Sequence, residues 1–223
     1  MAGSAQRLVR REARVQLSDR PLPRSFFARS SLEVAPDLLG RDVRAVSEAG
    51  VVRARLVEVE AYQGSADPGS HAFRGETPRN CVMFGPPGHL YVYFTYGIHW
   101  CANVVCGQDG IAEAILLRAA VILQGRDIVA SRRPRSTTRD LARGPARLAR
   151  ALALDGSDNG ADIVRGGLQF LPGEPAPATT IRTGPRVGVA GAGALTPWRY
   201  WIDGVPEVST YRPAVVRGPR KQA

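Results

Sequence analysis

The chain has 223 residues, which favours one globular domain over two, and 44% of them are hydrophobic, too many for a disordered chain. Lysine and arginine number 30 against 20 acidic residues, so the formal net charge is +10 and the protein should attract anions. Every basic residue except Lys221 is an arginine. Arginine suits phosphate binding, although a genome rich in arginine codons would give the same composition.

Composition also excludes several classes of protein. A Schiff-base mechanism needs a lysine amine in the site. The only lysine, Lys221, lies in a basic tail, so lysine-based covalent catalysis is not expected. Cys81, Cys101 and Cys106 are an odd number without a C-x-x-C pair, so neither a disulfide framework nor a zinc ribbon is indicated. No segment has the apolar length of a membrane span or the core of a signal peptide. We therefore expect a protein of the reducing cytoplasm.

The first half of the chain predicts two short helices and a hairpin. Residues 1–21 are polar and arginine-rich and predict a flexible basic arm before a domain at 22–212. Helical signals cover 26–31 and 34–39, with Gly40 at a stop position. Alternating residues at 42–47 and 51–62, around a turn at 48–50, predict a β-hairpin. Residues 63–87 predict a loop, whose length is typical of functional or disordered segments.

The second half predicts more strands than helices. Segments 89–96 and 99–106 predict a second hairpin, with Tyr96 at its tip beside Gly97. Residues 111–122 predict a strand, and 123–133 and 144–154 predict helices. Short strands follow at 166–172, 179–189 and 197–203, before a basic tail at 213–223. The expected class is α+β, with one antiparallel sheet and few helices.

Two carboxylates in the strand at 51–62 are candidates for acid–base chemistry. Strict alternation puts Glu58 and Glu60 on one face, together with Leu56 and Tyr62. Burial would raise a carboxylate pKa and neighbouring arginines would lower it, and one of the two groups could serve as a general base. The alternative is a solvated strand face with arginine partners.

Other polar and aromatic residues have two interpretations each. Tyr96 could wedge between stacked bases, or it could be an ordinary surface aromatic. His71 could donate a hydrogen bond to a ligand or cap a turn, and Asn103 could contact a base edge or a backbone group. Arg118 could hold a phosphate or a carboxylate. The histidine spacing does not fit a metal site, and we expect no metal.

Several motifs occur in order between residues 26 and 211, and together they resemble the alkyladenine (3-methyladenine) DNA glycosylase family. They are VEVEAYQG, SH, TPRN, MFGPPGHLYVYFTYG, CANVV, LLRA, RGPARLARAL and PRVGV. The resemblance implies a single α+β domain with a curved antiparallel β-sheet, a few flanking helices and a protruding β-hairpin. It also implies a monomer without cofactor or metal that acts on double-stranded DNA containing damaged purines.

The resemblance implies a role for each matching residue. Glu60 is similar to the general base that activates the attacking water, and Arg118 is similar to the arginine that helps to hold this water. The residues implied to bind the flipped base, the last of them by screening out guanine, are Tyr62, His71, Tyr93 and Asn103. Tyr96 is similar to the intercalating tyrosine. The residues implied to contact the DNA backbone or support the pocket are Thr77, Arg79, Asn80 and Arg143.

The implied reaction is hydrolysis of the N-glycosidic bond of a damaged purine, with 3-methyladenine, 7-methylguanine, hypoxanthine and ethenoadenine as the expected bases. Without an internal lysine, such an enzyme should be monofunctional and leave an intact abasic site. One alternative is a noncatalytic nucleic-acid-binding module, in which Glu60 is structural. Another is a transferase acting on a nucleotide or a formyl group, for which no cosubstrate fingerprint is present.

Overall fold

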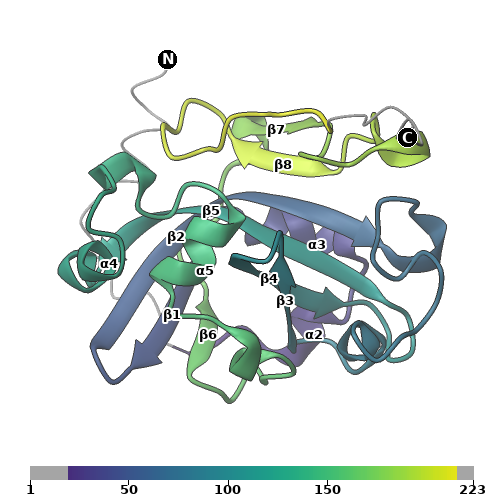
Figure 1. Ribbon diagram of the computed structural model, residues 1–223, viewed down its shortest axis with the longest axis horizontal. Helices are drawn as coiled ribbons and strands as arrows, with labels where there is room; N and C mark the ends of the chain where they lie inside the picture. The colour runs from purple at the N-terminus through teal and green to yellow at the C-terminus, as the bar shows by residue number, and fades with distance from the viewer. Residues whose placement is uncertain (1–19, 215–223) are drawn as a thin grey trace, which may run out of the picture.

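The computed structural model describes residues 20–214 (Figure 1), so the predicted basic arm and basic tail lie almost wholly outside the described residues. The strands within this part are β1 (Asp42–Ser47), β2 (Gly50–Gln63), β3 (Leu90–Thr95), β4 (His99–Cys106), β5 (Glu113–Gln124), β6 (Leu168–Leu171), β7 (Ile181–Gly184) and β8 (Arg199–Ile202). They form one antiparallel sheet in the order β3-β4-β5-β2-β1-β6, while β8 pairs with β2 and β7 pairs with β8. The predicted α+β class is confirmed.

The sheet is curved, because its two edges come close together. The β3 end lies beside the segment that leads to β6, where Leu90 N–H donates to the Ala161 carbonyl at 2.9 Å. His89, just before β3, forms a bridge with Asp162. Only five residues separate Asp162 from the start of β6, the opposite edge strand. A flat sheet of this order would hold its edge strands about 24 Å apart, at ~4.8 Å between neighbours.

The helices are few and short, and local sequence signals explain their bounds. They are α2 (Arg24–Phe27), α3 (Ser31–Leu38), α4 (Arg126–Arg132) and α5 (Pro145–Ala151). A capping box between Ser30 and Glu33 starts α3, and Gly40 follows it with a φ of 83°. Pro145 occupies the first turn of α5, directly after Gly144. Single 3-10 turns lie at Gly64–Ala66, Cys81–Phe84, Thr138–Asp140, Gly156–Asp158, Ala178–Thr180 and Gly191–Gly193.

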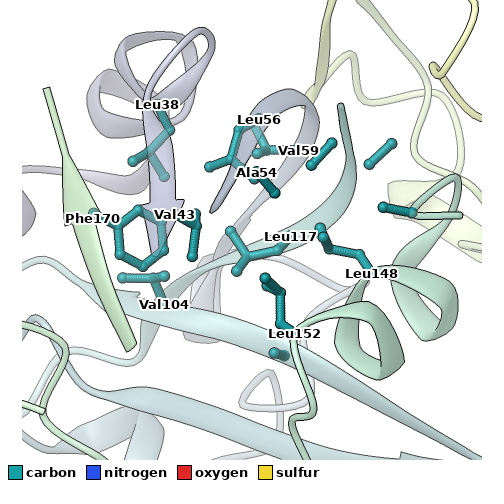
Figure 2. Packing of buried hydrophobic residues seen from close by; sticks show 14 of the residues in the cluster. Leu38, Val43, Ala54, Leu56, Val59, Val104, Leu117, Leu148, Leu152 and Phe170 are labelled. Carbon is teal, nitrogen blue, oxygen red and sulfur yellow. The ribbon is translucent and has the colours of Figure 1, made fainter. Parts of the chain in front are cut away.

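The main core lies between the sheet and the helices (Figure 2), and it corrects one sequence prediction. Strict alternation separates Leu56 from Val59, yet both belong to this core. The β2–β5 register explains the change, because β2 advances two residues from Leu56 to Glu58 while β5 advances one. From Glu58 to Val59 the opposite occurs, and Arg118 of β5 is left out of the ladder. These bulges change the face on which following side chains lie.

Candidate active site

Paired bulges at the middle of the sheet bring two carboxylates and one guanidinium together. Glu58 and Glu60 lie on the part of β2 that is flanked by β5 on one side and β8 on the other. Arg118 lies between them, with its Nε 2.8 Å from Glu58 Oε1 and its Nη1 3.2 Å from Glu60 Oε2. All three side chains are almost fully buried. The solvated strand face considered from sequence is therefore wrong.

Glu60 is held in one orientation by three donors. Its Oε1 accepts the backbone N–H of Val187 at 2.7 Å, and its Oε2 accepts the hydroxyl of Tyr62 at 3.0 Å and faces Arg118. An ionised carboxylate offers about four acceptor positions, so one position remains for a further donor such as water. Because Tyr62 itself lines the adjacent pocket, Glu60 is one hydrogen bond from whatever the pocket holds.

Glu58 is saturated by a different set of donors. Its carboxylate accepts the Nε–H of both Arg118 and Arg199, at 2.8 and 2.7 Å. It also accepts the backbone N–H and the hydroxyl of Ser209, at 2.6 and 2.8 Å. Although burial alone would raise its pKa, the charges of Arg118 and Arg199, together with hydrogen bonds from Arg118 and the Ser209 backbone, hold the pKa of Glu58 below its usual value. Through Ser209, Glu58 therefore anchors the 205–210 segment to the sheet.

A buried arginine supports Tyr62 from behind. Arg186 is fully buried and forms a two-point ion pair with Asp67, while its Nη1 also donates to the Ala61 carbonyl at 3.0 Å. Its guanidinium lies 4.5 Å from the ring centroid of Tyr62. Burial of the phenol and the neighbouring Glu60 charge raise the pKa of Tyr62 well above its usual value. The Tyr62 hydroxyl therefore stays protonated and donates to Glu60.

An aromatic pocket opens beside this carboxylate, and it spans about 320 Å³ when the solvent space at its mouth is included. The predicted base-binding residues come together here, from β2, β3, β4 and the 64–85 loop: Tyr62, Tyr93, Asn103 and His71. The rings of His71 and Tyr93 meet edge to face, with centroids 4.6 Å apart. Asn103 Nδ2 donates to the Tyr91 carbonyl at 3.0 Å, which fixes the orientation of its amide. The pocket thus combines aromatic rings with several hydrogen-bonding groups.

The polar groups of the pocket are neutral. Burial of the imidazole, with a smaller contribution from the Arg79 charge, lowers the pKa of His71 below its usual value. Its Nδ1 lies 3.0 Å from the Tyr91 hydroxyl. Burial also raises the pKa of Tyr93. Near neutral pH the pocket wall therefore offers hydrogen bonds and ring faces rather than charge.

The hairpin of β3 and β4 carries an exposed aromatic tip. Tyr96 is 90% exposed and its φ is 52°, in the left-handed region, as is that of Gly97 at 69°. Ile98 N–H donates to the Thr95 carbonyl at 3.2 Å and closes the turn. Two consecutive left-handed residues are typical of the two-residue turns of β-hairpins. The predicted position of Tyr96 at a hairpin tip is confirmed.

The residues predicted to contact the DNA backbone differ in their surroundings. Thr77 and Arg79 are exposed beside the pocket, and the Arg79 guanidinium lies 5.9 Å from the Tyr93 ring centroid. Asn80 is buried, and its amide donates to the carbonyls of His71 and Gly75 and accepts from Thr77. Asn80 therefore holds the pocket loop in shape from within.

Arg143 lies away from this loop. Its Nε donates to the Val208 carbonyl at 2.9 Å, and its Nη2 donates to the Thr210 hydroxyl at 3.0 Å. It thus flanks Ser209, one of the residues that hold Glu58. In the described structure, Arg143 thus contacts the protein segment around Ser209, and its predicted contact with the DNA backbone stays a prediction.

Sequence reasoning missed the residues that hold the site from a distance. Glu58 was considered only as a partner of Glu60, and its donors Arg199 and Ser209 were not singled out. Arg186 and Val187 fall within the PRVGV motif, which could have signalled them, although no role followed from it. Residues 69, 70, 83, 91 and 114 complete the pocket lining.

Two negative findings concern residues 20–214 only. In this range no cluster of three or more His, Cys, Asp or Glu side chains could hold a metal ion. No helix within it combines the length and the apolar character needed to cross a membrane.

Comparison with known proteins matches residues 25–206 to the family described as methylpurine-DNA glycosylase. A Streptomyces avermitilis protein named "Putative 3-methyladenine DNA glycosylase" is 53% identical over 196 residues, covering 86% of this chain and 92% of the relative. Proteins of the same name from Leifsonia xyli and Burkholderia cenocepacia are 52% and 47% identical, covering 85% and 87% of this chain and 92% and 93% of the relatives. These matches place the chain among the DNA glycosylases. Within that class, it belongs to the methylpurine-DNA glycosylase family, as the motifs predicted.

Proposed function

We propose that the protein is a monofunctional DNA glycosylase that flips alkylated or deaminated purines out of duplex DNA and hydrolyses their N-glycosidic bond. The expected bases are 3-methyladenine, 7-methylguanine, hypoxanthine and ethenoadenine. The observation that carries this proposal is the buried Glu60 carboxylate, joined by the Tyr62 hydroxyl to an aromatic pocket. We expect the enzyme to act as a monomer, in the reducing cytoplasm, without a cofactor.

Glu60 is the proposed general base. A water on its remaining acceptor position would lose a proton to the carboxylate as the water oxygen bonds to the sugar C1′. The C1′–N bond breaks at the same time, and its electron pair leaves with the base. A carboxylate beside the sugar also stabilises the positive charge that develops on the ring. Arg118, whose Nη1 lies 3.2 Å from Glu60 Oε2, is proposed to help hold the water.

The pocket residues are proposed to bind the flipped base. Tyr62, Tyr93 and His71 offer ring faces and edges for stacking, and their hydrogen-bonding groups are oriented by neighbours. Asn103 projects into the same pocket with a fixed amide, where it would clash with the exocyclic amine of guanine. This clash would disfavour undamaged guanine in the pocket.

Tyr96 is the proposed wedge. A glycosylase must take its target out of the stack, and an aromatic side chain can fill the gap that remains. The exposed position of Tyr96 supports this role, while Thr77 and Arg79 are exposed on the pocket side for backbone contacts. The formal net charge of +10 supports binding to DNA phosphates.

The test is single-turnover release of free base from a labelled duplex with one hypoxanthine, with alkylated DNA in parallel. We expect base release, and strand breakage only after alkali, because the chain has no internal lysine for lyase chemistry. Glu60→Gln should slow release about 10²–10⁴-fold and leave binding of lesion DNA intact. Folded wild-type protein that binds lesion DNA but releases no base from either substrate would instead be a noncatalytic binding module.

A further inference from the structure

The β3–β4 hairpin has two faces, and only one of them faces the base pocket. On that face, Tyr91 is paired with Asn103 and Tyr93 with Cys101. The other face is apolar and continues toward the tip as the cross-strand pair Phe94 and Trp100, whose ring centroids are 4.7 Å apart. The exposed tip at Tyr96 therefore stands between two different surfaces of the hairpin.

The second surface borders a wide hollow between the hairpin and α5, the helix beside β4 in Figure 1. Its lining includes Ile98 and Trp100 from the hairpin. It also includes Arg132 from α4 and Arg150 from α5. With the solvent space at its mouth included, the hollow spans about 800 Å³, compared with about 320 Å³ for the base pocket on the same measure. It is also open to solvent on one side. Its size and shape suit an extended backbone better than a single base.

Of the two arginines that line this hollow, Arg150 is the one whose side chain has no partner among residues 20–214. It is exposed, and it forms no hydrogen bond or ion pair with any residue at 20–214. Arg132 instead donates to the Ala151 carbonyl and the Ser47 hydroxyl, so it adds charge but is held in place. Asp155 also lines the hollow, but its carboxylate accepts both the N–H and the hydroxyl of Ser157.

Two other arginines, Arg133 and Arg147, lie near Arg150 and add positive charge. Burial and then the positive charges of Arg147 and Arg150 lower the pKa of Arg133. Its Nε is buried and has no hydrogen-bond partner among the described residues. Arg147 pairs with Asp140 at 3.1 Å and is not part of the hollow lining. Like charges repel one another, and a bound anion relieves that repulsion.

The position of the hollow relative to the tip identifies the anion. A duplex whose stack is opened by Tyr96 must pass over both faces of the hairpin, with the flipped nucleotide on the pocket face. Packed β layers are about 10 Å thick, and bases in DNA rise about 3.4 Å each. The backbone that lies over the hollow is therefore about three nucleotides from the flipped position.

We propose that this hollow, which we call the flanking site and define by Ile98, Trp100, Arg132 and Arg150, binds the DNA backbone on the side of the wedge opposite to the base pocket. Arg150 contacts a phosphate, and the apolar pair Ile98 and Trp100 contacts the neighbouring sugar. This inference rests on the proposed function, because it takes Tyr96 as the wedge.

The test uses Arg150→Ala and a probe that the enzyme cannot process, a duplex with one central tetrahydrofuran abasic analogue. Arg165→Ala is the matched control, because Arg165 is also exposed and its side chain has no partner among residues 20–214. We expect Arg150→Ala to weaken binding about tenfold. The slope of log affinity against log salt should fall by about one unit. Arg165→Ala should change the affinity much less.

A second measurement locates the contact. Neutral methylphosphonate linkages are placed one at a time within three to four nucleotides of the abasic analogue, on either strand. At one position the wild-type affinity should fall to that of Arg150→Ala, and the variant should lose nothing further. That position also identifies the strand.

The flanking site is refuted if Arg150→Ala binds like Arg165→Ala, or if its deficit persists at every neutral linkage. Base release from hypoxanthine DNA by the wild-type protein is measured separately. Its absence would count against the proposed function, whatever the binding data show.

Discussion

Two carboxylates on one strand, two residues apart, lie in very different surroundings. Glu58 accepts four hydrogen bonds from residues of β5, β8 and the 205–210 segment, and its pKa is held below the usual value. Glu60 is bonded to a pocket residue, a backbone amide and Arg118, and keeps an unused acceptor position. The comparison shows that burial alone does not identify a catalytic group. What distinguishes Glu60 is that one of its partners faces a cavity.

The largest expected difference between Glu58 and Glu60 is in their contribution to the free energy of unfolding. Glu58→Gln leaves two buried arginines without their shared counter-charge and should lower the free energy of unfolding by about 3–5 kcal/mol. Denaturant unfolding of the variant measures this loss. Glu48→Gln, an exposed change in the β1–β2 turn, is the control and should change little. A Glu58→Gln protein as stable as the wild type would show that the anchor role is wrong.

The second effect is on the pH dependence of stability. Because the folded pKa of Glu58 is depressed below its usual 4.5, its stabilising contribution is complete above that value. The contribution is lost as the pH falls through the lower pKa of the folded protein. The difference in thermal midpoint between wild type and Glu58→Gln should therefore be full at pH 7 and shrink at pH 3. A difference that stays constant over this range would contradict the ion-pair explanation.

The smallest effect concerns the link between Glu60 and the pocket. Tyr62→Phe keeps the ring that is proposed to stack on the base but removes the 3.0 Å hydrogen bond to Glu60. One such bond contributes about 1 kcal/mol, so single-turnover base release should slow about fivefold while the affinity for lesion DNA stays the same. Parallel measurement of rate and affinity checks this. A loss as large as that of Glu60→Gln would mean that the hydroxyl itself takes part in the chemistry.

Much of the fold could be predicted from local patterns. The hairpin of β1 and β2, the hairpin of β3 and β4, and the helix starting at Pro145 all follow from alternation, turn residues and a helix-start proline. The bulges at Glu58 and Arg118 could not be predicted, because they arise from pairing between strands that are about 60 residues apart. Strict alternation therefore misplaced Leu56.

The site could be predicted only in part, for a related reason. Glu60, Tyr62 and Tyr93 lie in strands with clear patterns, and the motifs identified their counterparts in a known family. The groups that orient them come from the far end of the chain: Val187 and Arg186 on the Glu60 side, and Arg199 and Ser209 on the Glu58 side. Contacts across more than 100 residues leave no periodic signal in the sequence.

The backbone conformation of Tyr96 lowers the stability of the folded protein. Non-glycine residues in the left-handed region are strained, by about 1 kcal/mol or more, and such turns ordinarily use asparagine or glycine. Here the strained position holds a large aromatic side chain that is 90% exposed and gains almost no burial. The turn conformation of the tip is thus already formed in the free protein, and the proposed insertion into DNA would not need to order it. Folding stability alone does not favour a tyrosine at this position, which supports the proposed role of Tyr96 as the wedge.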